Sequence, residues 1–312
     1  MANSTNSQIE LVESRSKALQ RVYLDLRYLA LGWASFAMLD RADKVALAKA
    51  TAFCCFVGHG RSGGTLAGAL LNAHPNVVIS NELHALRRLR LGLSFVQLCR
   101  LIHLVSKRQA ERGSIGGGGY MYRVSGQWQG RHQEIAVIGD RKAGATAHEI
   151  LAHPFVLDVM DRKVALLKKF IHVVRNPFDT IATTVNKTQR KNDESADSHL
   201  NREITNYFAR CQAIQAVKNR YGESAMYFLH HEALIADPRA ELTALCRFLA
   251  VQAHDDYLVD CSRIVNKEPN RTRISVNWPT AQIARVYEEI NAYAWLRDYG
   301  QDSAFTAFPK QS

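Results

Sequence analysis

The sequence predicts an α/β protein in which helices flank a central parallel β-sheet. Five short runs are apolar and rich in strand formers: "TAFCCFVG" (51–58), "NVVISNEL" (76–83), "EIAVIGD" (134–140), "KKFIHVVR" (168–175) and "AMYFLHH" (225–231). Continuous apolar runs of this length are typical of strands buried on both faces. Segments with apolar residues at three- and four-residue steps separate them, as in helices. Alternating strands and helices favour one parallel sheet in a single domain spanning residues 1–312.

The composition restricts the partners and the compartment. Lysine and arginine number 40 against 29 acidic residues, a surplus of 11 that favours anionic ligands without distinguishing a nucleotide, a nucleic acid, a lipid headgroup or an acidic sugar. The six cysteines form no CxxC pair, and no histidine stands beside them at metal-ligand spacing. The most apolar early run, 28–39, is too short to cross a bilayer. We therefore expect buried free thiols, no metal site, and a cytoplasmic protein without a transmembrane span.

An N-terminal helical extension is predicted over about residues 15–50. Its apolar residues recur at three- and four-residue steps, which place them in one stripe along a helix: Leu19, Val22, Leu26, Leu29, Trp33 and Phe36. We expect this stripe to cover the core, with a dimer seam or a lid as the alternatives.

The segment "FVGHGRSGGTL" (56–66) has the spacing of the phosphate-binding loop GxxxxGK[ST], but Gly64 occupies the lysine position. A strand precedes this loop and a helix follows it, so its backbone N–H groups would converge on an anion at the helix N-terminus. Arg61 adds a cation earlier in the loop. The predicted anion-binding residues are Gly60, Arg61, Ser62, Gly63, Gly64, Thr65 and Leu66. A plain strand-to-helix turn is the alternative, and the absent lysine argues against ATP hydrolysis.

The longer segment "GHGRSGGTLAGALLNAHPNVVISNE" (58–82) resembles the 5′-phosphosulfate-binding loop of sulfotransferases, in which PRSGTTLL is followed by LLxxHPxV and an acid. This resemblance implies a P-loop, nucleoside-kinase-like α/β fold. It also implies 3′-phosphoadenosine 5′-phosphosulfate (PAPS) as the donor, with Arg61 against its 5′-phosphate and the sulfuryl group.

A second segment, "FIHVVRNPFDTIATT" (170–184), resembles the 3′-phosphate motif of the same family. The resemblance gives Arg175 and Thr183 as ligands of that phosphate, where the family more often has serine in place of the threonine. A planar guanidinium suits phosphate oxygens. Arg271 and Arg273 lie in a region that often closes over the cofactor in the family. The alternatives are that Arg175 caps a strand and that the two later arginines belong to a solvated loop.

Sulfuryl transfer requires a base for the acceptor hydroxyl and cations for the developing charge. Glu82 follows a short strand and is the predicted base, matching a glutamate of sulfotransferases that act on tyrosine and some sugars. His84 and His103 are the other candidates, and Glu82 as a helix cap is the alternative. Lys142 matches a family lysine near the sulfuryl group and would stabilise the leaving oxygen.

The resemblance implies a sulfotransferase that moves a sulfuryl group from PAPS to a hydroxyl acceptor, which could be a carbohydrate, a lipid or another small molecule. We expect no nucleic-acid partner, and residues 84–135 are expected to form much of the acceptor pocket. Two alternatives stay open. One is a P-loop kinase-like phosphotransferase without the loop lysine, and the other is a non-catalytic nucleotide-binding module.

Overall fold

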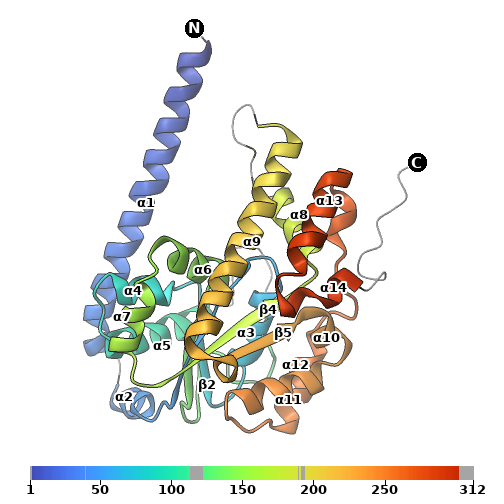
Figure 1. Cartoon of the computed structure of the whole chain (residues 1–312). Coiled ribbons are helices and arrows are strands. Elements are labelled where there is room, and N and C mark those ends of the chain that lie inside the picture. The colour runs from blue at the N-terminus through green and yellow to red at the C-terminus, as the bar shows by residue number, and fades with distance from the viewer. Residues whose placement is uncertain (1, 39, 113–121, 189, 191–193, 302–312) are drawn as a thin grey trace.

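A computed structural model describes residues 2–38, 40–112, 122–188, 190 and 194–301, apart from the side chains of 2–18, 36 and 301. Its centre is a parallel sheet of five strands in the order β2-β3-β1-β4-β5 (Figure 1). The strands are β1 (Ala52–Phe56), β2 (Val77–Asn81), β3 (Val137–Arg141), β4 (Leu167–Val174) and β5 (Met226–His230). Each coincides with one of the five runs that the sequence marks as strands, and β3 and β4 extend one residue beyond theirs. The predicted class, an α/β protein with a central parallel sheet flanked by helices, is confirmed.

Helices connect the strands and cover both faces of the sheet (Figure 1). They are α1 (Ala2–Met38), α2 (Arg41–Ala48), α3 (Gly64–Asn72), α4 (Ala85–Arg90), α5 (Phe95–Glu111), α6 (Ala143–Ala152), α7 (Val156–Lys163), α8 (Pro177–Lys187), α9 (Ala196–Tyr221), α10 (His231–Ala236), α11 (Pro238–Phe248), α12 (Asp255–Arg263), α13 (Thr280–Ile290) and α14 (Asp298–Gln301). Three 3-10 turns complete the elements: η1 (Glu223–Ala225), η2 (Thr272–Ser275) and η3 (Ala294–Leu296).

The core consists of two apolar clusters, one on each face of the sheet. Successive side chains of a strand point to opposite faces, so Phe53 and Cys55 of β1 enter the cluster covered by α4 to α9, whereas Cys54 and Phe56 enter the cluster covered by α3, α11 and α12. All six cysteines are buried and unbonded to one another, as expected.

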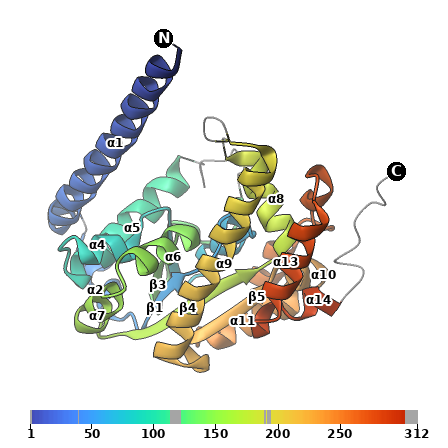
Figure 2. The same ribbon diagram turned by 45° about the horizontal axis from the view of Figure 1, so that its top comes forward.

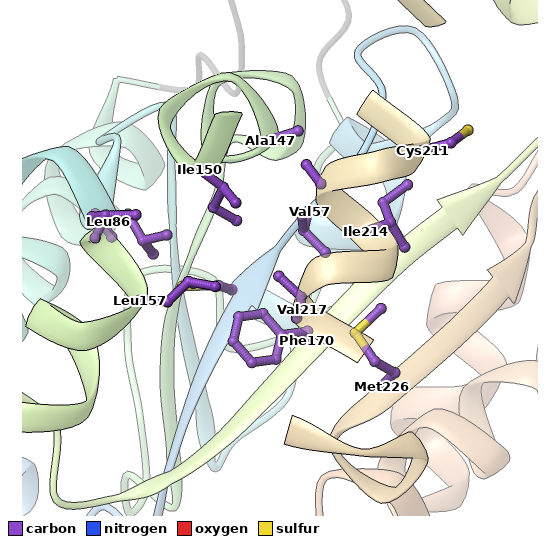
Figure 3. Close-up of a cluster of buried hydrophobic side chains, with 14 of the residues drawn as sticks. Val57, Leu86, Ala147, Ile150, Leu157, Phe170, Cys211, Ile214, Val217 and Met226 are labelled. Carbon is purple, nitrogen blue, oxygen red and sulfur yellow. The ribbon is translucent and has the colours of Figure 1, made fainter. Parts of the chain in front are cut away.

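Helix α9 lies across β1 and β4 and closes the first of these clusters (Figure 3). Its Ile214 and Val217 face Val57, which follows β1, and Phe170 of β4. These four side chains are no more than 1% exposed. Burying apolar side chains of this size contributes about 1.5–3 kcal/mol each, so the strand ends from which the site projects have a rigid base.

The strands β1 and β4 are neighbours, but the chain leaves them in opposite directions. After β1 it runs through α3 to β2, and after β4 it runs through α8 and α9 to β5. In open α/β sheets a ligand crevice forms at such a point, outside the carboxyl ends of the two strands. The fold therefore brings the loop after β1, residues 57–63, beside Arg175, which follows β4.

The N-terminal extension is the long helix α1, whose N-terminal end extends away from the body of the protein (Figures 1 and 2). The expectation that its apolar stripe covers the core is wrong. Four of the stripe's side chains are between 54% and 71% exposed: Leu19, Val22, Leu26 and Trp33. Leu29 packs partly against the core, and the side chain of Phe36 lies outside the described residues. No described helix is long and apolar enough to cross a membrane.

A different, more polar face of α1 docks on the body. Asp25 is buried between two cations, with 2.5 Å to Arg87 Nη2 and 2.6 Å to Arg88 Nη2. Burial raises the pKa of Asp25, but the two arginines outweigh that effect and lower it. Two helical turns further along, Gly32 lies so close to Leu93 that a Cβ would come within 2.7 Å of it. This ion pair and this close approach at a glycine hold the helix together with the partly buried Tyr28, Leu29 and Leu31, and neither of the two contributes to an apolar stripe.

Candidate functional site

The loop after β1 is held tightly at both ends. Gly58 (φ 126°) donates its backbone N–H to the carbonyl of Ala143, the first residue of α6, at 3.2 Å. Gly63 (φ 98°) caps α3. Both φ values lie in the region that favours glycine. The turn thereby ends at the N-terminus of a nine-residue helix and in contact with the start of another.

The N-terminus of α3 offers backbone donors to an anion. The first bond inside the helix runs from the N–H of Ala67 to the carbonyl of Gly63, so the helix uses none of the N–H groups of residues 64–66, as is general for helix starts. Thr65 is half-buried, but the side chain of Leu66 packs in the core. The hydroxyl of Ser62 is turned inward, where it donates to the carbonyl of His59 at 3.1 Å. The predicted loop therefore offers N–H groups more than side-chain hydroxyls.

Histidines behind the loop fix its shape. His59 is 4% exposed and stacks on Tyr207 with 3.8 Å between the ring centroids. His172 of β4 lies 3.1 Å from the carbonyl of Val57 through Nδ1. Burial lowers the pKa of His59 well below its usual value and that of His172 to about 3, so both rings are neutral. They are packing residues, which the sequence motif does not identify.

Gly58→Ala is expected to destabilise the protein and to distort the loop. The backbone conformation alone costs a side chain about 1–3 kcal/mol. The new Cβ would also stand 2.2 Å from His172 Nδ1, and overpacking of this kind costs about another 1–3 kcal/mol. Gly60→Ala is the matched control, because a Cβ there meets nothing within 4 Å. Urea unfolding of both variants tests this, and equal losses of stability would contradict it.

Arg175 connects three predicted parts of the site. Its Nη1 donates to the carbonyl of Arg61 at 2.9 Å and to Thr183 Oγ1 at 3.4 Å. Its Nη2 donates to the carbonyl of Asn270 at 2.5 Å and to Thr272 Oγ1 at 3.4 Å. The side chain therefore holds the loop after β1, the helix α8 and the 270–272 segment together.

Arg175 keeps its positive charge available to an anion. All four of these partners are neutral carbonyl or hydroxyl oxygens. Burial lowers the pKa of Arg175, and the nearby Asp179 and Glu232 act against that effect. A buried guanidinium whose hydrogen bonds go to neutral oxygens is well suited to a phosphate, which would form charge-assisted hydrogen bonds with it.

Arg61 stands at the turn of the loop in a left-handed conformation with φ 66°. Because Arg175 holds its carbonyl, the peptide plane that follows Arg61 is fixed, whereas its side chain is exposed. Arg271, next to the bound carbonyl of Asn270, is likewise exposed. The structure thus brings Arg61, Arg175, Thr183 and Arg271 to one place at the carboxyl ends of β1 and β4.

Arg273 lies apart from that exposed group. Its side chain is 3% exposed, and its Nη1 pairs with Asp179 Oδ2 at 2.7 Å while its backbone N–H donates to Asp179 Oδ1 at 2.8 Å. This arginine was predicted as a cofactor ligand. Its geometry instead makes it an anchor that holds the 270–275 segment against α8, with Arg271 turned outward.

Asp179→Ala is expected to lower the free energy of unfolding by about 3–5 kcal/mol, because it removes the carboxylate that pairs with the buried cation of Arg273. Urea unfolding measures this loss. The double variant Asp179→Leu/Arg273→Met replaces both charges by apolar groups and should recover much of the stability. A double variant no more stable than the single one would contradict a dominant role for the unpaired charge.

Glu82 stands between two cations at the carboxyl end of β2. Its Oε1 lies 2.9 Å from Arg141 Nη2, and its Oε2 lies 2.7 Å from Lys142 Nζ. Partial burial raises the pKa of Glu82, but Arg141 and Lys142 outweigh it and lower the pKa below the usual value. The carboxyl is therefore ionised at neutral pH. Its side chain remains 44% exposed, so an acceptor can reach it.

Asp140, at the end of β3, holds the turn that presents Glu82. Its carboxylate accepts the backbone N–H groups of Leu83 and Ala85, each at 3.0 Å, and the hydroxyl of Ser80 at 2.8 Å. Glu82 itself has φ 67°, a conformation rare for this residue type. Asp140 is 1% exposed. We did not single it out from the sequence, although an aspartate closing an apolar strand is a usable signal.

The two candidate histidines differ in position. His84 adjoins Glu82, is half-buried, and has its pKa lowered to about 3 by burial and by the cations Lys142, Arg88 and Arg87. His103 lies on α5 beside Asp43 of α2. Because α2 leads into the amino end of β1, His103 lies toward the opposite end of the strands from the site. The structure does not bring His103 to the site.

These features define an α/β protein with a glycine-rich loop that leads into a helix N-terminus, a buried arginine and a carboxylate between two cations, all at the carboxyl ends of parallel strands. Residues 165–256 match the family model of the sulfotransferase family. That match spans β4, Arg175, Thr183 and β5. It confirms the resemblance to sulfotransferases noted in the sequence.

Several sulfotransferases are among the solved structures similar to this chain. The sulfotransferase domain of the Synechococcus PCC 7002 olefin synthase is 16% identical, with 81% of this chain and 96% of that domain covered at a TM-score of 0.49. A Mycobacterium avium sulfotransferase is 8% identical, with 85% and 81% covered at a TM-score of 0.49. A mouse sulfotransferase complexed with PAP is 12% identical, with 82% and 88% covered at a TM-score of 0.46. A search of curated proteins finds no significant match.

Proposed function

We propose that the protein transfers a sulfuryl group from PAPS to a hydroxyl acceptor. The observation that carries this proposal is the position of Arg175, which joins the loop after β1 to the 270–272 segment while its bonds leave its charge unmatched. A donor with phosphates at both ends of its ribose requires two anion sites. The N–H groups at the start of α3 would hold the 5′ end, and Arg175 with Thr183 would hold the 3′-phosphate.

The position of Asp140 disfavours the kinase alternative. A P-loop kinase needs a lysine in its loop and a strand-terminal aspartate that holds Mg²⁺. Gly64 occupies the lysine position. Asp140 lies near the end of β3, the strand next to β1, but its carboxylate accepts two backbone N–H groups and a hydroxyl and is almost fully buried. Neither the loop position nor the end of β3 therefore provides the residue that metal-assisted phosphoryl transfer needs there.

The residues around Glu82 have the charges that sulfuryl transfer needs. As an ionised carboxylate, Glu82 would accept the proton of the acceptor hydroxyl as its oxygen attacks sulfur. Lys142 lies 2.7 Å from Glu82 and would stabilise the negative charge that develops on the leaving phosphate oxygen. Arg61, whose side chain is exposed at the loop, would neutralise the sulfuryl oxygens. Lys142 and Arg61 would supply the positive charge for these last two roles, which therefore do not require a metal ion.

A cavity of about 490 Å³ is the proposed acceptor pocket, and its described lining falls within the predicted region 84–135. Ala110 of α5 lines both this cavity and a smaller one that reaches Asn81 and Arg141, next to Glu82. The ionisable residues that line the cavity of about 490 Å³ are Lys107, Arg123, Arg131 and Glu111. This surplus of positive charge favours an acidic acceptor. Part of the predicted region, 113–121, lies outside the described residues.

Thermal unfolding with two ligands tests the proposed function. 3′,5′-Adenosine bisphosphate, the product of the donor, should raise the melting temperature without added metal, because it binds only the folded state. ATP with Mg²⁺ should have a smaller effect. Stabilisation by ATP–Mg²⁺ alone would point to the kinase. A non-catalytic nucleotide-binding module would bind the bisphosphate but transfer no label from radiolabelled PAPS to any member of a panel of acidic and neutral hydroxyl acceptors.

A further inference from the structure

A cluster of potential metal ligands lies away from the proposed catalytic site. It joins Asp43 of α2, His103 of α5 and His132 of the segment before β3. Asp43 Oδ1 is 3.2 Å from His103 Nε2 and 3.3 Å from His132 Nε2, and the three ligand atoms all lie within 4.8 Å of one another. The residues are far apart in sequence, which is why no ligand spacing revealed them.

The cluster is enclosed and incompletely bonded. His103 is 2% exposed, and the side chains of His132 and Asp43 are 14% and 15% exposed. Although Asp43 Oδ1 is near, His103 Nε2 has no hydrogen-bond partner of acceptable geometry among the described residues. A buried polar nitrogen without a partner costs about 1–3 kcal/mol. His132 Nε2 lies within hydrogen-bond distance of the same Asp43 oxygen, at 3.3 Å, so among the three ligand atoms it is His103 Nε2 that lacks a partner.

We propose that Asp43, His103 and His132 bind a zinc ion. Two imidazole nitrogens and one carboxylate oxygen form a ligand set that zinc commonly takes, with bonds of about 2.0–2.2 Å. In a tetrahedron with bonds of that length, neighbouring ligand atoms stand about 3.3–3.6 Å apart. The two distances from Asp43 Oδ1, 3.2 and 3.3 Å, come close to such edges before any adjustment. A water molecule would complete the tetrahedron.

The ion would fasten the segment before β3 to two helices. That segment already touches α5, since a Cβ at Gly130 would lie 2.5 Å from Ala110 Cβ. It also approaches the end of α2 through the ion pair of Glu134 with Lys49, at 2.8 Å. Gly130 and Ala110 line the proposed acceptor pocket. The zinc ion would therefore hold one wall of that pocket in place.

Isothermal titration of the full-length, chelator-treated protein with Zn²⁺ tests this inference, and neither donor nor acceptor is needed. We expect one ion per chain. His103→Gln and His132→Gln should each weaken binding by about a hundredfold or more, since even the outer partners of metal ligands contribute 10–100-fold. His148→Gln is the control, because His148 is an exposed histidine of α6 outside the cluster. Zinc binding that is absent from the wild type, or equal in all variants, would overturn the proposal.

Cobalt substitution keeps the test decisive if a variant fails to fold. Co²⁺ bound to the wild type should show the strong visible d–d absorption of tetrahedral coordination by nitrogen and oxygen. Thiolate-to-metal charge transfer would place the ion on a cysteine instead and overturn the assignment. The weak spectrum of an octahedral, mostly hydrated ion would overturn it as well.

Discussion

Glu82→Gln should lower turnover by about 10²–10⁴-fold, the usual contribution of a general base, and should leave the affinity for 3′,5′-adenosine bisphosphate nearly unchanged. Glutamine is close to glutamate in size but cannot accept the acceptor's proton. Transfer from radiolabelled PAPS to the best acceptor of the panel measures turnover, and calorimetry measures donor-site affinity. Activity at the wild-type level would remove Glu82 from the role of base and return His84 to consideration.

The pH dependence gives a second readout for Glu82. A base acts when deprotonated, so kcat/KM should fall as the pH drops through the pKa of Glu82. Arg141 and Lys142 hold that pKa below its ordinary value, so the acid limb should lie below the range of a typical glutamate. Lys142→Met removes one of these cations, raises the pKa of Glu82 and should shift the limb to higher pH, in addition to lowering the rate. If the acid limb of kcat/KM stays at the same pH in Lys142→Met, the limb reports the pKa of another group.

Arg175→Ala should weaken binding of 3′,5′-adenosine bisphosphate by about 1.5–3 kcal/mol, the range for a hydrogen bond to a charged group, which is roughly 10–150-fold in affinity. Arg175→Lys keeps the charge without the planar fork and should recover only part of the loss. Arg239→Ala on α11 is a surface control, with a side chain that is 48% exposed. Calorimetry measures all three variants, and an unchanged affinity in Arg175→Ala would exclude Arg175 from the site.

The sheet and the main loop could be predicted because their signals are local. Each of the five strands is a short apolar run, and the loop 56–66 combines glycine spacing with its position between a strand and a helix. Pro177 opens α8, in keeping with the preference of proline for the first helical turn. The basic stretch 83–112 forms two helices, α4 and α5, with a turn at Gly92, whose φ is 115°.

Other features depend on contacts between distant segments, which no local pattern encodes. Asp140 is important because its carboxylate meets the turn after β2, 55 residues or more away in sequence. In the sequence alone, Arg273 resembles any other basic residue of a loop. Its anchoring role depends on the contact with Asp179, which lies 94 positions earlier. The apolar residues of α1 recur with a helical period, but the period does not show which face of the helix contacts the body of the protein. The contact between Asp25 and Arg87, which docks the helix, joins residues that are 62 positions apart in the sequence.

Calorimetric comparison of 3′,5′-adenosine bisphosphate with adenosine 5′-monophosphate, without metal ions, tests the proposed donor site most directly. The two ligands differ only in the 3′-phosphate. We expect the wild type to bind the bisphosphate at least about tenfold more tightly, since one charge-assisted contact contributes about 1.5–3 kcal/mol, and Arg175→Ala should abolish most of this difference. Equal affinity of the wild type for both ligands, or a preference that survives in Arg175→Ala, would contradict the site described for the PAPS donor.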